Sequence, residues 1–207
     1  MTGPRARELL KQRALRIRSL RRTDWPNIER LFGNNGACGG CWCMTWRLPR
    51  GGRLWDASKG LPNKRALRGL VSRGEAHGLL AFSGREPVGW CSFGPRSDFP
   101  KFANSRTLND PAPFGAWVVT CFVVAPAWRG SGVATALLRA AVGCARGRRA
   151  SVLDGYPARP KPSARLPAAF ASTGVPTMFT RAGFHRARGG TRARPLMRHT
   201  FKARKLR

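Results

Sequence analysis

One short run of the chain combines residue types that could hold a doubly charged anion. Gly130 and Gly132 stand between an almost entirely apolar segment, 116–124, and a segment with apolar residues at helical spacing, 131–145. Because glycine has no Cβ, the peptide N–H groups of this turn can approach an anion closely. The same groups would open a helix, whose positive dipole end favours an anion, and Arg129 adds a formal charge. The run therefore predicts a diphosphate-binding turn between a buried strand and a helix.

Two better-known phosphate motifs do not fit this run. A Walker loop continues with Gly-Lys-Ser/Thr, whereas Gly132 is followed by Val133 and Ala134. The dinucleotide fingerprint has a different glycine spacing. The remaining alternative is an ordinary strand–turn–helix junction that happens to contain two glycines.

The rest of the chain supplies elements that would surround this junction. Apolar periodicity, capping residues and turn residues mark each of them. We expect strands at 14–20, 79–82, 87–93, 151–153, 184–188 and 195–201, helices at 23–33, 62–73 and 176–182, and a long loop at 94–112.

The junction resembles motif A of the GNAT acetyltransferases. Residues 124–134 read Val-x-Pro-x-x-Arg-Gly-x-Gly-x-Ala between a strand and a helix, and Gly183-Phe184 resembles the pair that closes the family's second cofactor motif. The order of elements is also similar. The resemblance implies an α/β (α+β) fold with a mixed central sheet of six to seven strands flanked by about four helices. It covers one domain, 14–201, with a basic extension at 1–13 and a basic tail at 202–207.

The resemblance also implies a reaction and a role for each residue of the junction. An amine would attack acetyl-CoA directly, without a covalent enzyme intermediate. The strand end formed by Phe122, Val123 and Val124 would pair with the pantetheine arm, and the Val124 amide would polarise the thioester carbonyl. The backbone amides that would bind the diphosphate belong to Arg129, Gly130, Ser131, Gly132, Val133, Ala134 and Thr135.

The sequence departs from the family pattern at Phe179. Many members carry a tyrosine four residues before the glycine of Gly183-Phe184, where it protonates the departing thiolate. Phe179 would keep the cofactor contact but cannot donate a proton, so Thr180 or an ordered water would have to substitute, or the thiolate would leave unprotonated. Tyr156, the only tyrosine, ends a different strand.

Asp154 is the strongest candidate for a general base among the nine acids. It ends the strand that follows the motif helix, and in the family this strand diverges from its neighbour to form the acyl-transfer cleft. The alternative is that Asp154 caps the loop at Gly155. Glu75 and Asp110 are weaker candidates on loops.

Four tryptophans are candidates for the acceptor site. Trp42 and Trp46 lie between the first two helices, in the segment that walls the acceptor pocket in the family. Together with Trp90 and Trp117 from strands, they could form an aromatic acceptor site, or they could pack in the core.

The cysteines give no clear metal site. Cys38, Cys41 and Cys43 lack a fourth ligand and a paired histidine, so no metal is expected, and we interpret them as small apolar lining residues and reduced thiols.

The charge is extreme, with 39 Lys and Arg against 9 Asp and Glu and a formal net charge of +30. Such a chain is poorly suited to polycationic acceptors, so we expect a small-molecule or protein amine of apolar or anionic character. The charge would also attract nucleic acid without sequence preference. An alternative is thus a GNAT-fold protein held on RNA or ribosomes, with or without catalysis. No apolar run is long enough to cross a membrane and no leader is evident, so we expect a cytoplasmic monomer or homodimer.

Overall fold

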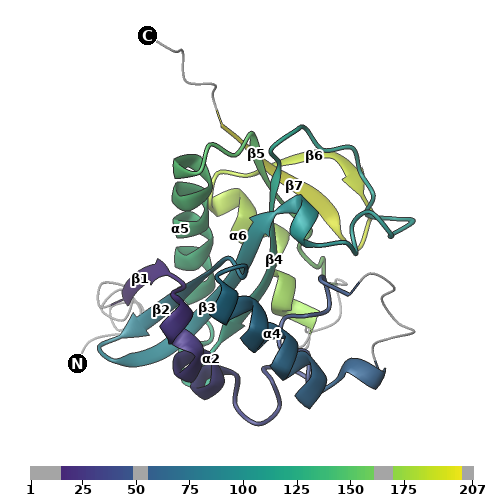
Figure 1. The fold of residues 1–207 in the computed structure, drawn as a ribbon. Coiled ribbons are helices and arrows are strands. Elements are labelled where there is room, and N and C mark those ends of the chain that lie inside the picture. The colour runs from purple at the N-terminus through teal and green to yellow at the C-terminus, as the bar shows by residue number, and fades with distance from the viewer. Residues whose placement is uncertain (1–14, 49–55, 161–169, 202–207) are drawn as a thin grey trace, which may run out of the picture.

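A seven-stranded mixed sheet forms the centre of the molecule (Figure 1). The computed structural model describes residues 15–48, 56–160 and 170–201. Neighbouring strands are antiparallel except for β4 and β5, which are parallel. The prediction of a mixed sheet of six to seven strands is confirmed. In spatial order the strands are β1 (Leu15–Ser19), β2 (Gly78–Ser83), β3 (Glu86–Pro95), β4 (Trp117–Val124), β5 (Val152–Gly155), β7 (Pro195–Thr200) and β6 (His185–Gly190).

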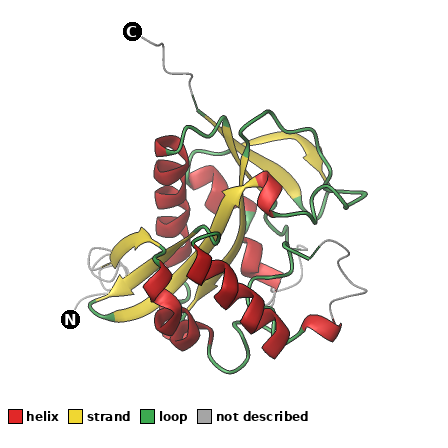
Figure 2. Cartoon of the chain, viewed as in Figure 1, coloured by secondary structure: helices red, strands yellow, loops and turns green. Residues whose placement is uncertain are grey.

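Helices cover both faces of this sheet (Figure 2). Along β2, Leu79 and Ala81 join one buried cluster and Leu80 and Phe82 join the other, as the alternation of a strand requires. The first cluster contains residues of α5 (Val133–Gly147) and α6 (Pro176–Arg181), and the second contains residues of α2 (Trp25–Phe32) and α4 (Leu61–Arg73). The predicted layer of about four helices is therefore confirmed. Short 3-10 turns, η1 (Arg22–Asp24), η2 (Arg96–Asp98), η3 (Pro126–Trp128) and η4 (Phe170–Thr173), lie between these elements.

A glycine sets how closely α5 approaches the sheet. Gly89 of β3 lies under the first turn of α5, where a Cβ would collide with Val133 and crowd Leu137. The same glycine pairs with Val124, the last residue of β4. The beginning of α5 is therefore held against the end of β4, as a site built from both elements requires.

The glycine- and cysteine-rich segment after α2 forms a series of turns. Among its non-glycine residues, Ala37, Trp42 and Cys43 have positive φ angles of 70°, 46° and 54°, which is uncommon outside glycine. These turns direct the Trp42 ring into the core, where it stacks on Trp25 at 5.7 Å and is 2% exposed. The described part of this segment, 34–48, contains turns and no helix or strand.

The long loop between β3 and β4 packs over the sheet. Phe99, Phe102 and Leu108 from this loop are buried in a third cluster with Trp46 and Tyr156. The predicted basic extension, 1–13, the tail, 202–207, and most of the proline-rich loop that follows β5 lie outside the described residues.

Candidate active site

The turn between β4 and α5 ends at a helix N-terminus that no side chain caps. Gly132 precedes α5 with a φ angle of 82°, in the left-handed region. The first hydrogen bond within the helix runs from the Ala136 N–H to the Gly132 carbonyl at 3.0 Å, so the N–H groups before Ala136 have no acceptor inside the helix. The first turn also contains no acidic residue. This end of α5 can offer several peptide N–H donors and a positive dipole end to an anion.

The backbone conformation at position 130 favours glycine. Its φ angle is 77°, and a Cβ there would meet nothing within 4 Å, so the approach to the turn is open. Ser131 Oγ donates a hydrogen bond of 2.7 Å to the Trp128 carbonyl, which tightens the turn. The exposed Arg129 directs its Nε toward the Val124 carbonyl at 3.4 Å.

The two parallel strands separate beside this turn. β4 and β5 pair only at Trp117 with Leu153, Val118 with Asp154 and Val119 with Gly155, although β4 continues to Val124 alongside β3. The register with β3 also shifts, because Ser92 opposes Cys121 and Phe93 opposes Val119. The unpaired Thr120 is thus a β-bulge, which bends the strand at this point. Beyond it, the end of β4 that contains Phe122, Val123 and Val124 has no β5 partner among the described residues.

Phe179 does not face open space. Its ring is 0% exposed, meets Phe184 edge-on at 5.0 Å, and lies so close to Gly155 that a Cβ there would collide with it. The predicted cofactor contact of this side chain therefore has no exposed surface to support it. Thr180 is exposed, and its hydroxyl donates to the Pro176 carbonyl at 3.2 Å.

Asp154 is placed differently from the prediction. Its carboxylate is 0% exposed and accepts two hydrogen bonds, of 2.7 and 2.8 Å, from Arg198 on β7. The two residues are directly opposite each other in the sheet. A buried carboxylate held in this fork cannot meet an incoming amine, so we replace the general-base assignment by a structural ion pair between β5 and β7.

A second polar network lies at the end of β5, and the sequence did not identify it. The Tyr156 hydroxyl donates to an Asp110 oxygen at 3.0 Å and accepts from Arg96 at 3.1 Å. The same Asp110 oxygen accepts the Gly190 N–H at 2.9 Å. Burial raises the pKa of Tyr156 to about 12. Its hydroxyl is consequently protonated at neutral pH and joins the β3–β4 loop to β5 and β6.

The four tryptophans do not form one acceptor site. Trp42 and Trp90 are buried in the cluster under α2 and α4, Trp46 is buried in the loop cluster, and Trp117 is buried in the cluster under α5. Each ring is 8% exposed or less. The prediction of a shared aromatic wall is therefore wrong, and packing in three separate parts of the core accounts for these side chains.

Two half-buried cations, Lys101 and Arg194, lie close enough for their charges to interact, and no sequence motif indicated them. Lys101 places its ammonium over the Trp46 ring at 5.1 Å, and Arg194 donates to Thr173 Oγ1 at 2.9 Å. Burial lowers the pKa of both groups, and Arg194 lowers that of Lys101 further. Neither cation forms an ion pair with a carboxylate among the described residues. Because the two residues are far apart in the sequence, no local motif could have indicated that they lie close together.

The cysteines lie mainly in the core. Cys43 Sγ is 2.9 Å from Cys121 Sγ, and burial raises the pKa of the Cys43 thiol well above its usual value. Such a thiol stays protonated and unreactive. Within the described ranges, no three His, Cys, Asp or Glu side chains are grouped so as to hold a metal ion. None of the helices described has the length and apolar character needed to span a membrane.

Comparisons with known proteins agree with this geometry. The model of the acetyltransferase (GNAT) family matches residues 44–159, more than half of the chain. No curated protein matches the sequence.

Solved structures share the fold at low identity. The yncA protein of Salmonella typhimurium, solved with its cofactor acetyl-CoA, is 16% identical over 93% of this chain and 97% of its own, with a TM-score of 0.55. The PaiA N-acetyltransferase of Thermoplasma acidophilum, solved with coenzyme A, is 13% identical over 90% and 99%, with a TM-score of 0.52. A ribosomal-protein-alanine N-acetyltransferase from Brucella melitensis is 18% identical over 90% and 99%, with a TM-score of 0.52. The family match, the diverging parallel strands and the open helix end together identify the chain as a member of the acetyltransferase (GNAT) family.

Proposed function

We propose that the protein transfers the acetyl group of acetyl-CoA to the amine of an anionic acceptor. The observation that carries the proposal is the uncapped N-terminus of α5 beside the point where β4 and β5 separate. Two solved structures of the same fold hold acetyl-CoA or coenzyme A, and the family match supports the same donor for this chain.

The backbone would do most of the cofactor binding. Peptide N–H groups of Gly130 and of residues 132–135 would surround the diphosphate at the positive end of α5. Those of Arg129 and Ser131 already donate to the Pro126 and Trp128 carbonyls, at 3.3 and 3.4 Å. The end of β4 from Phe122 to Val124 would pair with the pantetheine arm, and the Val124 N–H would donate to the thioester oxygen as negative charge develops there. None of these roles depends on a titratable side chain.

Water would take the proton of the acceptor amine. Seven of the eight acids among the described residues already accept a hydrogen bond or an ion pair, as Asp154 and Asp110 do. The eighth, Glu86, starts β3 and pairs with Ser83 across the hairpin turn. The reaction would then require an amine that is already neutral, and the thiolate would leave to water.

Lys101 and Arg194 would select the acceptor's charge. Placing two cations near each other in a half-buried position is unfavourable unless an anion compensates them. The described residues supply no carboxylate partner, and the segments 49–55 and 161–169 contain no Asp or Glu. A carboxylate or phosphate on the acceptor would meet both cations and lie beside Trp46, which already contacts Lys101.

The test is a screen of amines for release of free coenzyme A from acetyl-CoA. We expect turnover with amines that carry a carboxylate or phosphate and little turnover with polyamines. On the acidic side, log kcat/KM should rise with pH along the titration of the acceptor amine alone. If a second pKa, belonging to the enzyme, also shaped the acidic side of this pH profile, a side chain would be acting as the base.

A lysine substitution tests the acceptor site. Lys101→Gln should raise the KM of an anionic acceptor about tenfold, the loss expected for one charge-assisted contact, without changing the KM of acetyl-CoA. Lys64→Gln is the matched control, because Lys64 also lies over a tryptophan ring, that of Trp42 at 5.3 Å, but on α4. Equal effects of the two variants would remove Lys101 from the acceptor site.

The net charge of +30 supports a second candidate function, residence on RNA or ribosomes. The test is binding of a mixed-sequence RNA at several salt concentrations. RNA binding that falls steeply with salt, in a protein that does not bind acetyl-CoA, would favour this second function over catalysis.

A further inference from the structure

A recess lies at the end of the β4–α5 unit that is opposite the diphosphate turn. It has a volume of about 300 Å³ and is formed where β1, β2 and β3 meet the start of β4 and the end of α5. The diphosphate turn lies beyond Val124, whereas this recess includes Trp117, at the other end of the same strand. The two sites are therefore separated by the length of β4.

The ionisable side chains that line the recess carry a positive charge or no charge. Arg21 and Arg22 come from the segment after β1, and Arg148 follows the last residue of α5. No Asp or Glu is part of the lining. Asp24, close in sequence, is taken by Arg18 through two contacts of 2.6 Å. Asp98 lies 3.9 Å from His77, which together with Cys144 completes the titratable residues of the lining.

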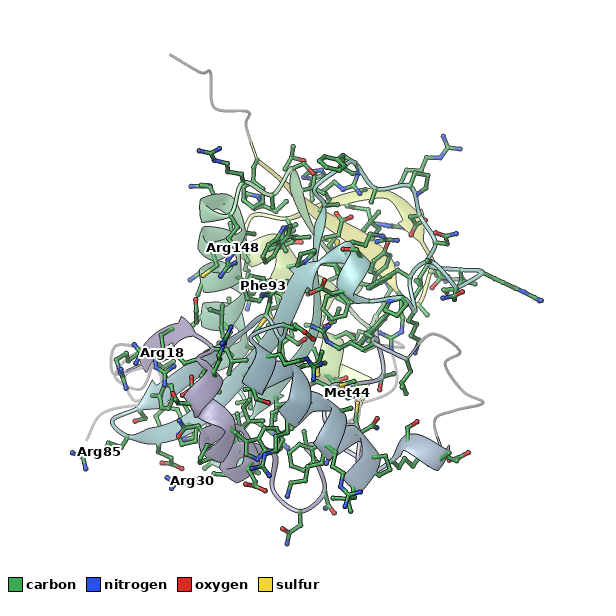
Figure 3. All side chains as sticks on the ribbon, in the orientation of Figure 1. Arg18, Arg30, Met44, Arg85, Phe93 and Arg148 are labelled. Atoms are coloured by element: carbon green, nitrogen blue, oxygen red, sulfur yellow. The ribbon has the colours of Figure 1, made fainter. Side chains whose placement is uncertain are left out.

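Aromatic rings form another side of the recess. Trp117 and Phe93 are both part of the lining, and Phe93 and Arg148 are labelled in Figure 3. The His77 ring stacks on Trp117 at 5.3 Å with an angle of 21° between their planes. The Arg148 guanidinium lies 5.9 Å from the centre of the Trp117 ring. Trp117 and Phe93 are only 8% and 3% exposed, so the half-buried His77 ring and the guanidinium groups border the open space.

The needs of the fold do not explain this arrangement. A cation near a helix C-terminus is favourable, but Arg146 already stands in the last turn of α5. Arg21 and Arg22 are brought to the same place from another element, against the repulsion between like charges. Burial is the main cause that lowers the pKa of His77. Asp98 opposes this effect, and Arg148 and Arg47 add to it, so the charge of Arg148 acts on this ring.

We propose that this recess binds a small organic anion in which a flat apolar ring carries a phosphate or carboxylate group. The ring would lie against the half-buried His77 ring, which itself stacks on Trp117, and the anionic group would meet Arg22 and Arg148. The volume suits a single ring with one anionic group. Binding would be independent of coenzyme A and of catalysis.

The test is isothermal titration calorimetry with phenyl phosphate and with benzoate, at about 0.15 M ionic strength and with saturating coenzyme A. We expect saturable binding of at least one probe, weaker binding of inorganic phosphate and none of benzyl alcohol. The stronger probe shows whether the recess prefers phosphate or carboxylate. Benzyl alcohol binding as tightly as the charged probes would overturn the proposal, as would no binding of either.

Arginine variants connect the binding to the recess. Arg148→Gln and Arg22→Gln should each weaken the binding about tenfold, since each removes a charge-assisted hydrogen bond. Arg146→Gln is the matched control, because Arg146 lies at the same helix end but points to Phe201, 5.8 Å from its ring centre. Unchanged acetyl-CoA affinity would confirm that each variant is folded.

Three results would contradict the proposal directly. If coenzyme A displaced the probe, the probe would be binding at the diphosphate turn. If Arg146→Gln weakened binding as much as Arg148→Gln, only general charge would be involved. If a single-stranded oligonucleotide bound with the same arginine dependence and the probes did not, the recess would belong to a polymer-binding surface.

Discussion

The two ends of the β4–α5 unit are both suited to anions but are built from different parts of the chain. At one end, the peptide N–H groups of the first turn of α5, which follow a glycine turn, have no acceptor within the helix. At the other end, arginine side chains from separate elements surround a recess bordered by Trp117 and Phe93. The first site is made of backbone and the second of side chains.

The helix dipole makes this difference physically important. The N-terminus of α5 is positive and supports an anion by itself, whereas its C-terminus is negative and repels one. At the second end the arginines must therefore overcome the helix as well as their mutual repulsion. The first site should depend on backbone conformation and tolerate changes of side chain, and the second should depend on each arginine.

Negative charge at the first turn of α5 should have the largest effect. We expect Thr135→Glu to weaken acetyl-CoA binding by about 100-fold or more, because a carboxylate would stand where the diphosphate binds. The same substitution should leave folding unchanged or stabilise it by about 0.5 kcal/mol, since acids are favourable at a helix N-terminus. Calorimetry and thermal unfolding separate the two effects. Phenyl phosphate affinity at the other end should not change.

Gly132→Glu tests the same end more severely. It should abolish acetyl-CoA binding, and it also forces a side chain into a φ angle of 82°, so some loss of stability is expected. Gly143→Glu is the control on the same helix, where a Cβ would meet nothing within 4 Å. Normal acetyl-CoA affinity in the Gly132 variant would refute the backbone-built site.

Asp154 tests a position that belongs to neither end. Asp154→Asn should lower the free energy of unfolding by about 3 kcal/mol, because it leaves Arg198 without its buried partner. Urea unfolding measures this change. Under conditions where the variant is folded, affinities at both ends should remain unchanged. A large loss of turnover with no loss of stability would restore Asp154 as a catalytic group.

Replacing both partners sharpens the interpretation of that pair. Asp154→Leu combined with Arg198→Met removes the two charges together and should recover much of the lost stability. If the double variant were as unstable as the single one, packing around Asp154 would matter more than the ion pair.

The same contrast explains what the sequence could predict. The end of the unit that is built from backbone could be predicted from the sequence. Its glycine spacing, as at Gly130 and Gly132, and its helix periodicity lie within a short stretch of the chain. The positions of the strands along the chain followed from the same kind of local signal. The position of Asp154 at the end of β5 was also predicted, but its partner Arg198 lies 44 residues later, so its burial could not be seen.

Side-chain clusters could not be predicted from the sequence, because their members are far apart along the chain. Arg22, His77 and Arg148 line one recess only because ends of four strands and of two helices, α4 and α5, come together there. Lys101 and Arg194 likewise come together from a loop and a hairpin. The tryptophans misled the interpretation because residue type alone does not distinguish Trp46 in a wall from Trp46 in a core.

His77 gives the smallest and most local test of the side-chain-built end. Its pKa is lowered in the free protein mainly by burial, against the opposing effect of Asp98, with smaller lowering effects of Arg148 and Arg47. An anion in the recess should raise this pKa by about one unit, or about 1.4 kcal/mol of interaction. Since the complex would then hold its proton more tightly, affinity for phenyl phosphate should increase as pH falls through the pKa of the complex.

NMR titration of the histidine Cε1–H signals, with and without the probe, measures the shift. His199 on β7, whose pKa burial also lowers, is the internal control and should not move. Equal shifts at both histidines would indicate anions spread over the whole basic surface, and the distinction between the two ends of β4 would no longer hold.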